Sequence, residues 1–545
     1  MNPNNPAKSN ELTADVAIIG GGVGGCAAAI AIARNGGRVI LTEETNWIGG
    51  QLTSQAVPPD EHRYIEQRGC TRAYREFRNR VRDYYRRNYP LTGEAYSNLQ
   101  LNPGNGSVSR LCHEPRVALA VLTEMLQPYL SSGHVTLFTY HKPTDAQTQG
   151  DRVNTVTVEE TRTGRKTTLY APYFLDATEL GDLLPLTNTE FVTGAESQSD
   201  TGELHAPTVA QPDNHQAFTY CFAIDYLEGE DHTIQKPPEY DFWRDYVPAL
   251  TPAWTGKLLS LTMTNPFTLE PRPMNFDPVR EASGDVWGFW LYRRILDKQN
   301  FRGSTFQSDI CLVNWPQNDY LLGNLVGVSE EEQAKHLNSG KQLSLSLLYW
   351  LQTEAPRDGG ATGWKGLRLR PDITDTADGL AKAPYIREAR RIKAEFTICE
   401  QHVGTQARMS VTRQSETEVQ ALPFPDSVGV GAYRIDLHPS TGGDNYIDVS
   451  SLPFQIPLGA MIPQRIENLI PACKNIGVTH ITNGCYRLHP VEWNIGESAG
   501  LLALYCVQRN TSPRAVRNTP SLLEDFQKWI QAQGVETEWL QTRPL

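Results

Sequence analysis

Asp15-Val16-Ala17-Ile18-Ile19-Gly20-Gly21-Gly22-Val23-Gly24-Gly25 is the stretch that decides the fold, because an apolar strand runs directly into the spacing Gly20-x-Gly22-x-x-Gly25. Residues 26–33 then continue as an alanine-rich helix. In such a unit the first glycine allows a tight turn, the second lets a diphosphate approach the backbone, and the third lets helix and strand pack closely. The helix amino terminus presents free N–H groups to the anion. This stretch therefore predicts a dinucleotide site.

A second apolar strand, residues 38–43, supports the same interpretation. It ends at Glu43, which stands about twenty residues after the glycines, where an acid accepts hydrogen bonds from a ribose. Glu44 follows it directly. A carboxylate at this place would repel a 2′-phosphate, so the pattern disfavours NADP and leaves FAD and NAD open.

Composition narrows the class of protein. The chain has 545 residues, of which 39% are hydrophobic and 21% charged, as in a globular enzyme of two domains. Its formal net charge of -12 disfavours nucleic acid or an anionic membrane as the main partner. We expect a small-molecule substrate, and the oligomeric state stays open.

Cysteine spacing and apolar runs bear on metals and on location. The nine cysteines form no Cys-x-x-Cys pair, so we expect no metal site and no dithiol centre. The first ten residues lack the charged-then-apolar order of a signal segment. Residues 16–33 are the only long apolar run, and the glycine turn interrupts it. We therefore expect a cytoplasmic protein without a membrane span.

The distribution of residue types along the chain predicts an α/β protein with a discontinuous nucleotide-binding domain. Residues 12–195 and 441–510 share strands, small-residue helices and glycine turns, whereas residues 196–440 are richer in proline, tryptophan and acids. We expect the middle region to be a mixed α+β substrate or cap domain, and residues 511–545 to form a terminal helix and tail. No second Gly-x-Gly-x-x-Gly unit with a following acid occurs, so no separate nicotinamide domain is expected. Apolar spacing predicts helices at residues 72–84, 116–129, 330–351 and 521–531.

Four ordered motifs together resemble a known family. They are the glycine turn with Glu43, Gly49-Gly50-Gln51, residues 176–182 (Asp-Ala-Thr-Glu-Leu-Gly-Asp) and residues 495–500 (Ile-Gly-Glu-Ser-Ala-Gly). The set resembles the FAD-dependent oxidoreductases of the glutathione-reductase superfamily, in the branch described only as "FAD-dependent oxidoreductase". The resemblance implies a Rossmann-like FAD-binding domain with an inserted cap domain.

The resemblance also implies which residues contact FAD. The diphosphate would lie on the glycine turn, the adenosine ribose at Glu43 and the adenosine beside Ala177 and Thr178. The late small-residue helix would direct its amino terminus at the N1–C2=O edge of the flavin, where a helix dipole stabilises negative charge. The full set of expected contacts is Gly20, Gly22, Val23, Gly24, Gly25, Glu43, Glu44, Gly49, Gly50, Gln51, Ala177, Thr178, Asn494, Ile495, Gly496 and Glu497.

A flavin enzyme that oxidises a C–H bond also needs a base for the accompanying proton. Histidine suits this task because its ordinary pKa lies near neutrality. His489, which precedes the late helix, is the first candidate, and His438 is the second; a purely structural role is the alternative for each. Arg387, Arg390 and Arg391 could clamp an anion. Expected pocket residues are His113, Asn314, Trp315, Tyr385 and Arg387.

These residues predict an FAD-dependent oxidoreductase that oxidises a small organic substrate by hydride transfer to flavin N5, as a dehydrogenase or oxidase. A flavin monooxygenase is the alternative enzyme. A flavin-binding scaffold or sensor without turnover is the alternative of another class, and an NAD-binding Rossmann protein is a third.

Overall fold

The computed structural model describes residues 10–279, 288–539 and 544. A five-stranded parallel sheet lies at the centre of the first part of the molecule, in the order β23-β8-β2-β3-β4. Its strands are β2 (Val16–Ile19), β3 (Val39–Glu43), β4 (Val135–Thr139), β8 (Tyr173–Asp176) and β23 (Leu469–Pro471). The last strand comes from the far end of the chain, so the predicted α/β class with a discontinuous sheet is confirmed.

Alternation along β2 explains the layers on either side of this sheet, because successive side chains of a strand point to opposite faces. Val16 and Ile18 belong to the core shared with the helices, whereas Ala17 and Ile19 belong to a separate cluster. That cluster lies against a second sheet in the order β1-β7-β6-β5. Its strands are β1 (Asn10–Thr13), β5 (His141–Gln149), β6 (Arg152–Glu160) and β7 (Lys166–Tyr170).

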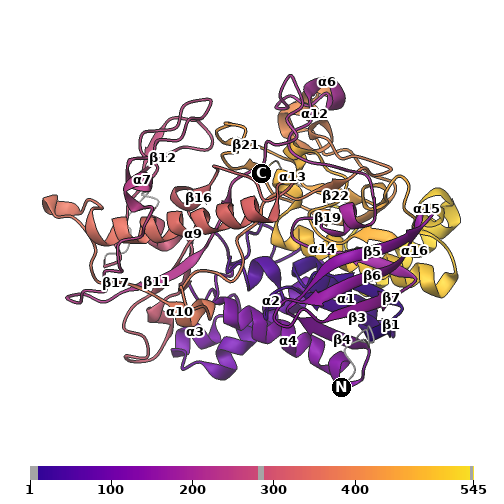
Figure 1. Cartoon of the computed structure of the whole chain (residues 1–545), viewed down its shortest axis with the longest axis horizontal. Helices are drawn as coiled ribbons and strands as arrows, with labels where there is room; N and C mark the ends of the chain where they lie inside the picture. Colours follow the sequence, from indigo (N-terminus) through magenta and orange to yellow (C-terminus); the bar gives the residue numbers. More distant parts are fainter. Residues whose placement is uncertain (1–9, 280–287, 540–543, 545) are drawn as a thin grey trace, which may run out of the picture.

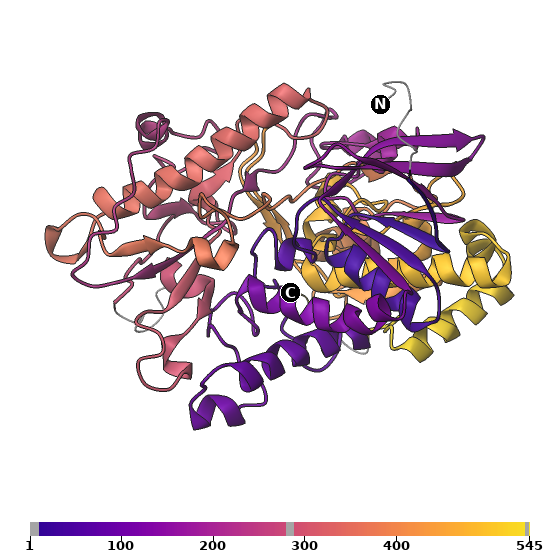
Figure 2. The ribbon, with the colours of Figure 1, turned by 60° about the horizontal axis from the view of Figure 1, so that its bottom comes forward.

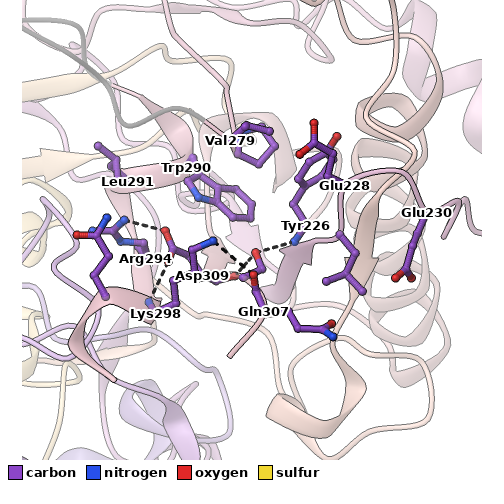
Figure 3. A pocket seen from close by; sticks show the side chains of 14 residues that line it. Tyr226, Glu228, Glu230, Val279, Trp290, Leu291, Arg294, Lys298, Gln307 and Asp309 are labelled. Carbon is purple, nitrogen blue, oxygen red and sulfur yellow. Dashed lines mark hydrogen bonds and ion pairs between the residues drawn. The ribbon is translucent and has the colours of Figure 1, made fainter. Parts of the chain in front are cut away.

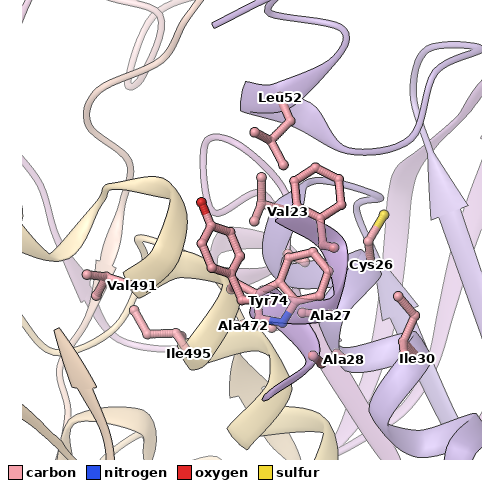
Figure 4. Close-up of a cluster of buried hydrophobic side chains, with 14 of the residues drawn as sticks. Val23, Cys26, Ala27, Ala28, Ile30, Leu52, Tyr74, Ala472, Val491 and Ile495 are labelled. Atoms are coloured by element: carbon pink, nitrogen blue, oxygen red, sulfur yellow. The ribbon is translucent and has the colours of Figure 1, made fainter. Parts of the chain in front are cut away.

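Two helices pack closely on the helical side of the parallel sheet. They are α1 (Val23–Arg34) and α14 (His489–Arg509), which lie side by side in Figures 1 and 2. Figure 4 shows Val23 and Ala27 of α1 close to Tyr74, with Val491 and Ile495 of α14 nearby. Tyr74 comes from α2 (Arg72–Asn88), which in turn contacts α4 (Pro115–Ser131).

The second part of the molecule is a mixed α+β body built on an antiparallel sheet in the order β14-β15-β11-β17. Its strands are β11 (Phe222–Tyr226), β14 (Arg294–Leu296), β15 (Ile310–Val313) and β17 (Leu367–Leu369). Helix α9 (Glu330–Thr353) runs along this body in Figure 1 and contributes Leu343 and Leu347 to its core. The members of this core fall within residues 217–386, with Tyr446 added.

Segments after this core form two further small sheets, one of which returns to the first part. β18 (Arg391–Ile392) pairs with β9 (Phe191–Val192), and β19 (Ser427–Gly431) pairs with β22 (Phe454–Pro457). The domain limits at 195, 440 and 510 stay predictions. The four predicted helices are present, and the last of them is α16 (Pro520–Gln533).

One stretch differs from the sequence-based expectation. α13 (His480–Tyr486) forms where the sequence predicted no helix, and α14 begins at His489, before the small-residue motif of residues 495–500. The Thr479 side chain caps α13 by accepting from the Thr482 N–H, and Pro490 occupies the first turn of α14, where its missing N–H costs nothing.

Across the described residues, no helix is both long and apolar enough to cross a membrane.

Candidate functional site

The turn between β2 and α1 leaves no room for side chains. Gly20 has a φ of +101°, and a Cβ there would lie 2.1 Å from the Ala177 carbonyl oxygen. A Cβ on Gly25 would lie 2.0 Å from the Gly20 carbonyl oxygen. α1 starts at Val23 with Gly22 as its N-cap, which offers no side chain, and the Gly24 N–H of the first turn donates to Glu492 Oε1 at 3.3 Å. A helix start of this kind is typical of an anion site, and the diphosphate contacts stay a prediction.

A cavity of about 420 Å³ opens at this turn. Glycine backbone lines one side of it, and the ends of β3 and β8 line another. The predicted cofactor residues that line the cavity are Gly20, Gly22, Glu43, Glu44, Gly50, Ala177 and Thr178. Beyond them the wall continues through Ser54, Gln55, Tyr220 and the stretch Lys382, Ala383, Pro384 and Ile386.

Glu43 is fixed by three hydrogen bonds at the edge of the cavity. Its Oε2 accepts from the Gly21 N–H at 3.1 Å, and its Oε1 accepts from the Thr45 N–H at 2.8 Å and the Thr45 hydroxyl at 2.7 Å. Burial raises the pKa of Glu43 to about 7, and the Thr45 hydrogen bonds oppose that rise. The side chain lies where the sequence motif expects a ribose contact.

Two glutamines that follow Gly50 in the chain have buried amide atoms without hydrogen-bond partners. Gln51 Nε2 donates to the Arg487 carbonyl oxygen at 3.0 Å, while its Oε1 is buried without a partner. Both side-chain atoms of Gln55 are also buried and unpaired. Such groups carry a free-energy cost that a polar ligand would remove. The glycine cradle, the helix start and these amides fit the diphosphate and polyol portions of FAD.

The late motif, residues 494–497, lies farther along its helix than the sequence implied. These residues lie in the second and third turns of α14 rather than at its start, so the expected helix terminus at Gly496 is wrong. Asn494 Oδ1 accepts from the Val430 N–H at 3.1 Å, and Glu497 Oε2 accepts from Trp493 Nε1 at 3.0 Å. None of the four, all within the described chain, lines the cavity.

His489, not Ile495, is therefore the first residue of α14. Its side chain is fully buried, and its Nδ1 accepts from the Asp60 N–H at 3.1 Å. Its Nε2 is buried without a partner. Burial lowers the pKa of His489 to about 3. A neutral imidazole whose Nδ1 accepts carries its proton on Nε2, so His489 is a hydrogen-bond donor toward its surroundings.

His438 follows β20 (Ile435–Leu437) and is held by carboxylates. Its Nδ1 lies 2.6 Å from Asp319 Oδ2, and its Nε2 lies 3.7 Å from Asp436 Oδ2. Asp319 also pairs with Arg387 at 3.0 Å and accepts from the Thr219 hydroxyl at 2.5 Å. Burial acts to raise the pKa of Asp319, but the charges of Arg387 and His438 outweigh it and hold that pKa below its usual value.

Three of the predicted pocket residues belong to this charged cluster. Arg387 contacts Asn314 Oδ1 at 3.4 Å, and its guanidinium lies 5.0 Å from the centre of the Tyr385 ring. Tyr385 accepts a hydrogen bond from Arg487 Nη1 at 3.1 Å. Arg487 also pairs with Asp436 at 3.3 Å. The cluster thus joins the neighbourhood of α14 to the second body of the molecule.

The other predicted pocket residues are placed elsewhere or serve packing. Trp315 stacks on Phe289 at 4.6 Å inside the second core, and His113 packs on Phe77 with its Nδ1 3.0 Å from the Glu114 carbonyl oxygen. Each of the three arginines of the expected anion clamp forms an ion pair, Arg387 with Asp319, and the clamp stays a prediction. Arg390 pairs with Asp182, and Arg391 pairs with Glu388 and Glu196, so their charges are already used.

Sequence reasoning missed several charged members of the cluster. They are Asp60, which pairs with Arg293 at 3.0 Å, together with Asp319, Asp436 and Arg487. Asp60 and Arg293 are 233 positions apart, and Asp319 and His438 are 119 apart. No local spacing relates such partners, so only the fold brings them together.

A second cavity of about 350 Å³ lies in the antiparallel body and shares no lining residue with the first. Figure 3 shows Trp290, Arg294 and Asp309 at its wall. Arg294 pairs with Asp309 at 2.8 Å and with Asp297 at 2.9 Å. These two carboxylates therefore compensate the positive charge of Arg294. In the described parts of the chain, no group of three or more His, Cys, Asp or Glu side chains is arranged to hold a metal ion.

Comparisons with known proteins bear on the identity of this site. The family described as "FAD dependent oxidoreductase" matches residues 15–530. A comparison with curated proteins found no match.

Several solved structures are similar over parts of the chain. E. coli quinol fumarate reductase FrdA is 10% identical, with 96% of this chain and 74% of that chain covered and a TM-score of 0.36. The flavin-dependent monooxygenase PieE is 11% identical, covering 71% and 52% with a TM-score of 0.29. L-proline dehydrogenase from P. horikoshii is 14% identical, covering 35% and 25% with a TM-score of 0.18. The chain thus spans a quarter of the proline dehydrogenase chain and about half of PieE.

The family match covers nearly all of the described chain and includes both segments that build the parallel sheet. It agrees with the glycine turn, the cavity and the carboxylate at the end of β3. The cofactor is FAD, and this chain belongs to the FAD dependent oxidoreductase family.

Proposed function

We propose that this protein is an FAD-dependent dehydrogenase or oxidase that removes a hydride and a proton from a small organic substrate. The observation that carries the proposal is the pairing of the partly buried His438 with the buried Asp319 inside a cluster that also holds Tyr385, Arg387 and Arg487. Bound FAD supplies the hydride acceptor. The remaining task, removal of a proton, falls to a side chain of this cluster.

His438 is the group we assign to the proton. Asp319 engages its Nδ1, which orients the ring and stabilises the positive charge that the imidazole gains on taking up a proton. Its Nε2 is then the nitrogen that accepts a proton, and the nearest carboxylate, Asp436, is 3.7 Å from it. Arg387 holds Asp319 from the other side. These contacts position one base with a fixed tautomer.

His489 suits a different task. Because its Nδ1 already accepts a backbone hydrogen bond and its pKa is lowered to about 3, it does not take up a proton near neutral pH. Its Nε2–H is a fixed donor at the amino terminus of α14. We propose that it contributes, with the helix dipole, to stabilising negative charge on the reduced cofactor.

The sequence supports the direction of the reaction. It contains one dinucleotide fingerprint, which the parallel sheet uses, and no second one for NAD(P)H. We therefore propose that electrons enter from the organic substrate rather than from a reduced nicotinamide.

Anaerobic mixing of the holoenzyme with a panel of small alcohols, amines and hydroxy acids tests the proposal. Loss of the flavin absorbance band without NAD(P)H is the expected result. A flavin that is reduced only when NAD(P)H is present would favour a monooxygenase, and a flavin that no compound reduces would favour a non-catalytic scaffold. His438→Gln holoenzyme with equal FAD content is the control, and its reduction by the same compound should be slow.

A further inference from the structure

Two carboxylates lie over the glycine turn, the fully buried Glu492 and the partly exposed Glu179. Glu492 Oε1 accepts from the Gly24 N–H at 3.3 Å. A Cβ on Gly22 would lie 3.0 Å from Glu179 Oε1 and 3.7 Å from Glu492 Oε1, and a Cβ on Gly50 would lie 2.8 Å from Glu179 Oε1. The two acids therefore occupy the same small region as the backbone groups that a diphosphate would use.

One positively charged side chain lies close to these two carboxylates. Lys474, in the segment after β23, has a fully buried side chain and forms an ion pair with Glu179. Glu492 Oε2 accepts from the Gln51 amide. Lys474 and Glu179 are the charged groups that act on Glu492. The nearby thiols of Cys26 and Cys473 stay neutral because burial raises the pKa of each.

The charges do not balance once a diphosphate is added. Two carboxylates and two phosphate charges would face one ammonium group, and like charges in a buried site repel strongly because little solvent screens them. The Glu179 side chain is about one quarter exposed, at 26%, whereas Glu492 is fully buried. Glu492 is thus the carboxylate that gains most from losing its charge.

We propose that FAD binds to this protein together with one proton, with Lys474 as the counter-ion of the diphosphate and Glu492 as the group that takes up the proton from solvent. Once protonated, Glu492 no longer competes as an anion for the Gly24 N–H, and its O–H can donate to a phosphate oxygen. Lys474 shifts its ion pair from Glu179 toward the diphosphate. No other atom or charge is exchanged, and the inference concerns cofactor binding, so it does not rest on the proposed reaction.

The cost of this proton is small near neutral pH. Burial raises the pKa of Glu492 to about 7, Lys474 acts against that rise, and Glu179 adds to it. Binding of a dianion raises the pKa further. Above about pH 7, Glu492 is ionised in the free protein and protonated in the complex, so the affinity for FAD should fall as the pH rises. Below that pH the affinity should level off.

The test measures FAD release from the holoenzyme, by the recovery of FAD fluorescence on serial dilution from about pH 6 to about pH 9. For the wild type we expect the apparent Kd to rise up to about tenfold per pH unit above about pH 7. Glu492→Gln should still bind FAD, with the rise in apparent Kd above about pH 7 reduced relative to wild type, whereas Glu43, whose pKa burial also raises to about 7 at the cavity edge, titrates in both proteins. A wild-type Kd independent of pH, or the wild-type slope in Glu492→Gln, would overturn the proposal.

Two further variants separate local from general effects. Glu203 is also buried, with a pKa raised to about 7, but it accepts from the Thr479 hydroxyl and the Glu400 N–H rather than from the glycine turn. Glu203→Gln should therefore keep the wild-type slope, and loss of that slope would count against the proposal. Lys474→Met should raise the Kd by about tenfold or more at every pH, whereas Lys474→Arg should restore much of the affinity. Wild-type affinity in Lys474→Met, with folding checked by circular dichroism, would refute the counter-ion role.

Discussion

Gly496 in α14 lies directly against Gly24 in α1, and a Cβ on Gly496 would be 2.1 Å from the Gly24 carbonyl oxygen. On its other side, a Cβ on Gly24 would be 1.8 Å from the Ala472 carbonyl oxygen. The backbones of two helices and one loop thus meet without intervening side chains. This contact holds the amino terminus of α14, with His489 and Glu492, beside the glycine turn.

Replacing Gly496 with alanine should force α1 and α14 apart. We expect the free energy of unfolding to fall by about 1–3 kcal/mol or more, as for other overpacked cores, with a lower FAD content. Urea unfolding and the flavin-to-protein absorbance ratio measure both effects. Gly93→Ala is the control, since a Cβ there meets no atom within 4 Å. Equal stability of Gly496→Ala and wild type would show that the contact is not tight.

Glu43→Gln should weaken FAD binding. Glu43 Oε2 accepts a hydrogen bond from the Gly21 N–H. In the glutamine variant an amide N–H would face the Gly21 N–H, and two donors do not form a hydrogen bond. We expect the Kd for FAD to rise about tenfold, as for the loss of one hydrogen bond to a charged group. Glu44→Gln is the matched control and should change the Kd less. FAD fluorescence quenching measures the two values. An unchanged Kd in Glu43→Gln would contradict a ribose contact.

Asp319→Asn should slow flavin reduction without removing FAD. The substitution leaves His438 Nδ1 without its carboxylate, so the ring loses both its orientation and the partner of its positive charge. We expect the anaerobic reduction rate to drop about 100-fold. Asp225→Asn is the control, because Asp225 pairs with Arg368 and Arg370 in the second body. A reduction rate within about twofold of wild type would remove His438 from the proposed chemistry.

His489→Asn should leave the pH dependence of flavin reduction unchanged. With a pKa near 3, His489 is neutral throughout the range in which the holoenzyme is assayed. We expect a lower rate, since a donor at the start of α14 is altered, but the same profile of rate against pH. A basic or acidic limb that disappears only in His489→Asn would reverse the assignment.

Each buried neutral histidine should contribute a loss of stability on acidification, whereas Glu43, Glu203 and Glu492, whose pKa values burial raises to about 7, contribute with the opposite sign. The pKa of His113 is lowered to about 4 and that of His489 to about 3, both by burial. The unfolded chain therefore takes up protons first as the pH falls below about 6.5, and the native state loses about 1.4 kcal/mol per pH unit for each such histidine. Urea unfolding from about pH 6.5 to about pH 4.5 measures this slope, and His113→Phe should reduce it by about one proton. An unchanged slope would show that His113 is not protonated on unfolding.

Local patterns accounted for much of the fold. The strand, glycine turn and helix at the start of the chain follow from apolar alternation and from backbone positions that only glycine can occupy, such as Gly20. The helices around Tyr74 and Leu343 follow from apolar spacing along a few turns. The late helix was misplaced by six residues, because small residues that suit helix packing were interpreted as a cofactor-facing terminus.

By itself, the sequence determined that this chain binds a dinucleotide on a parallel sheet, since each requirement of that site lies within about thirty consecutive residues. Only the tertiary structure decided which charges meet: Asp60 with Arg293, and Asp319 with His438. It also set Glu492 on Gly24 and left His489 buried and neutral, with its Nδ1 accepting from the Asp60 N–H. The physical reason is that pairing and burial depend on three-dimensional proximity between distant segments, and the spacing of residues along a chain does not specify that proximity.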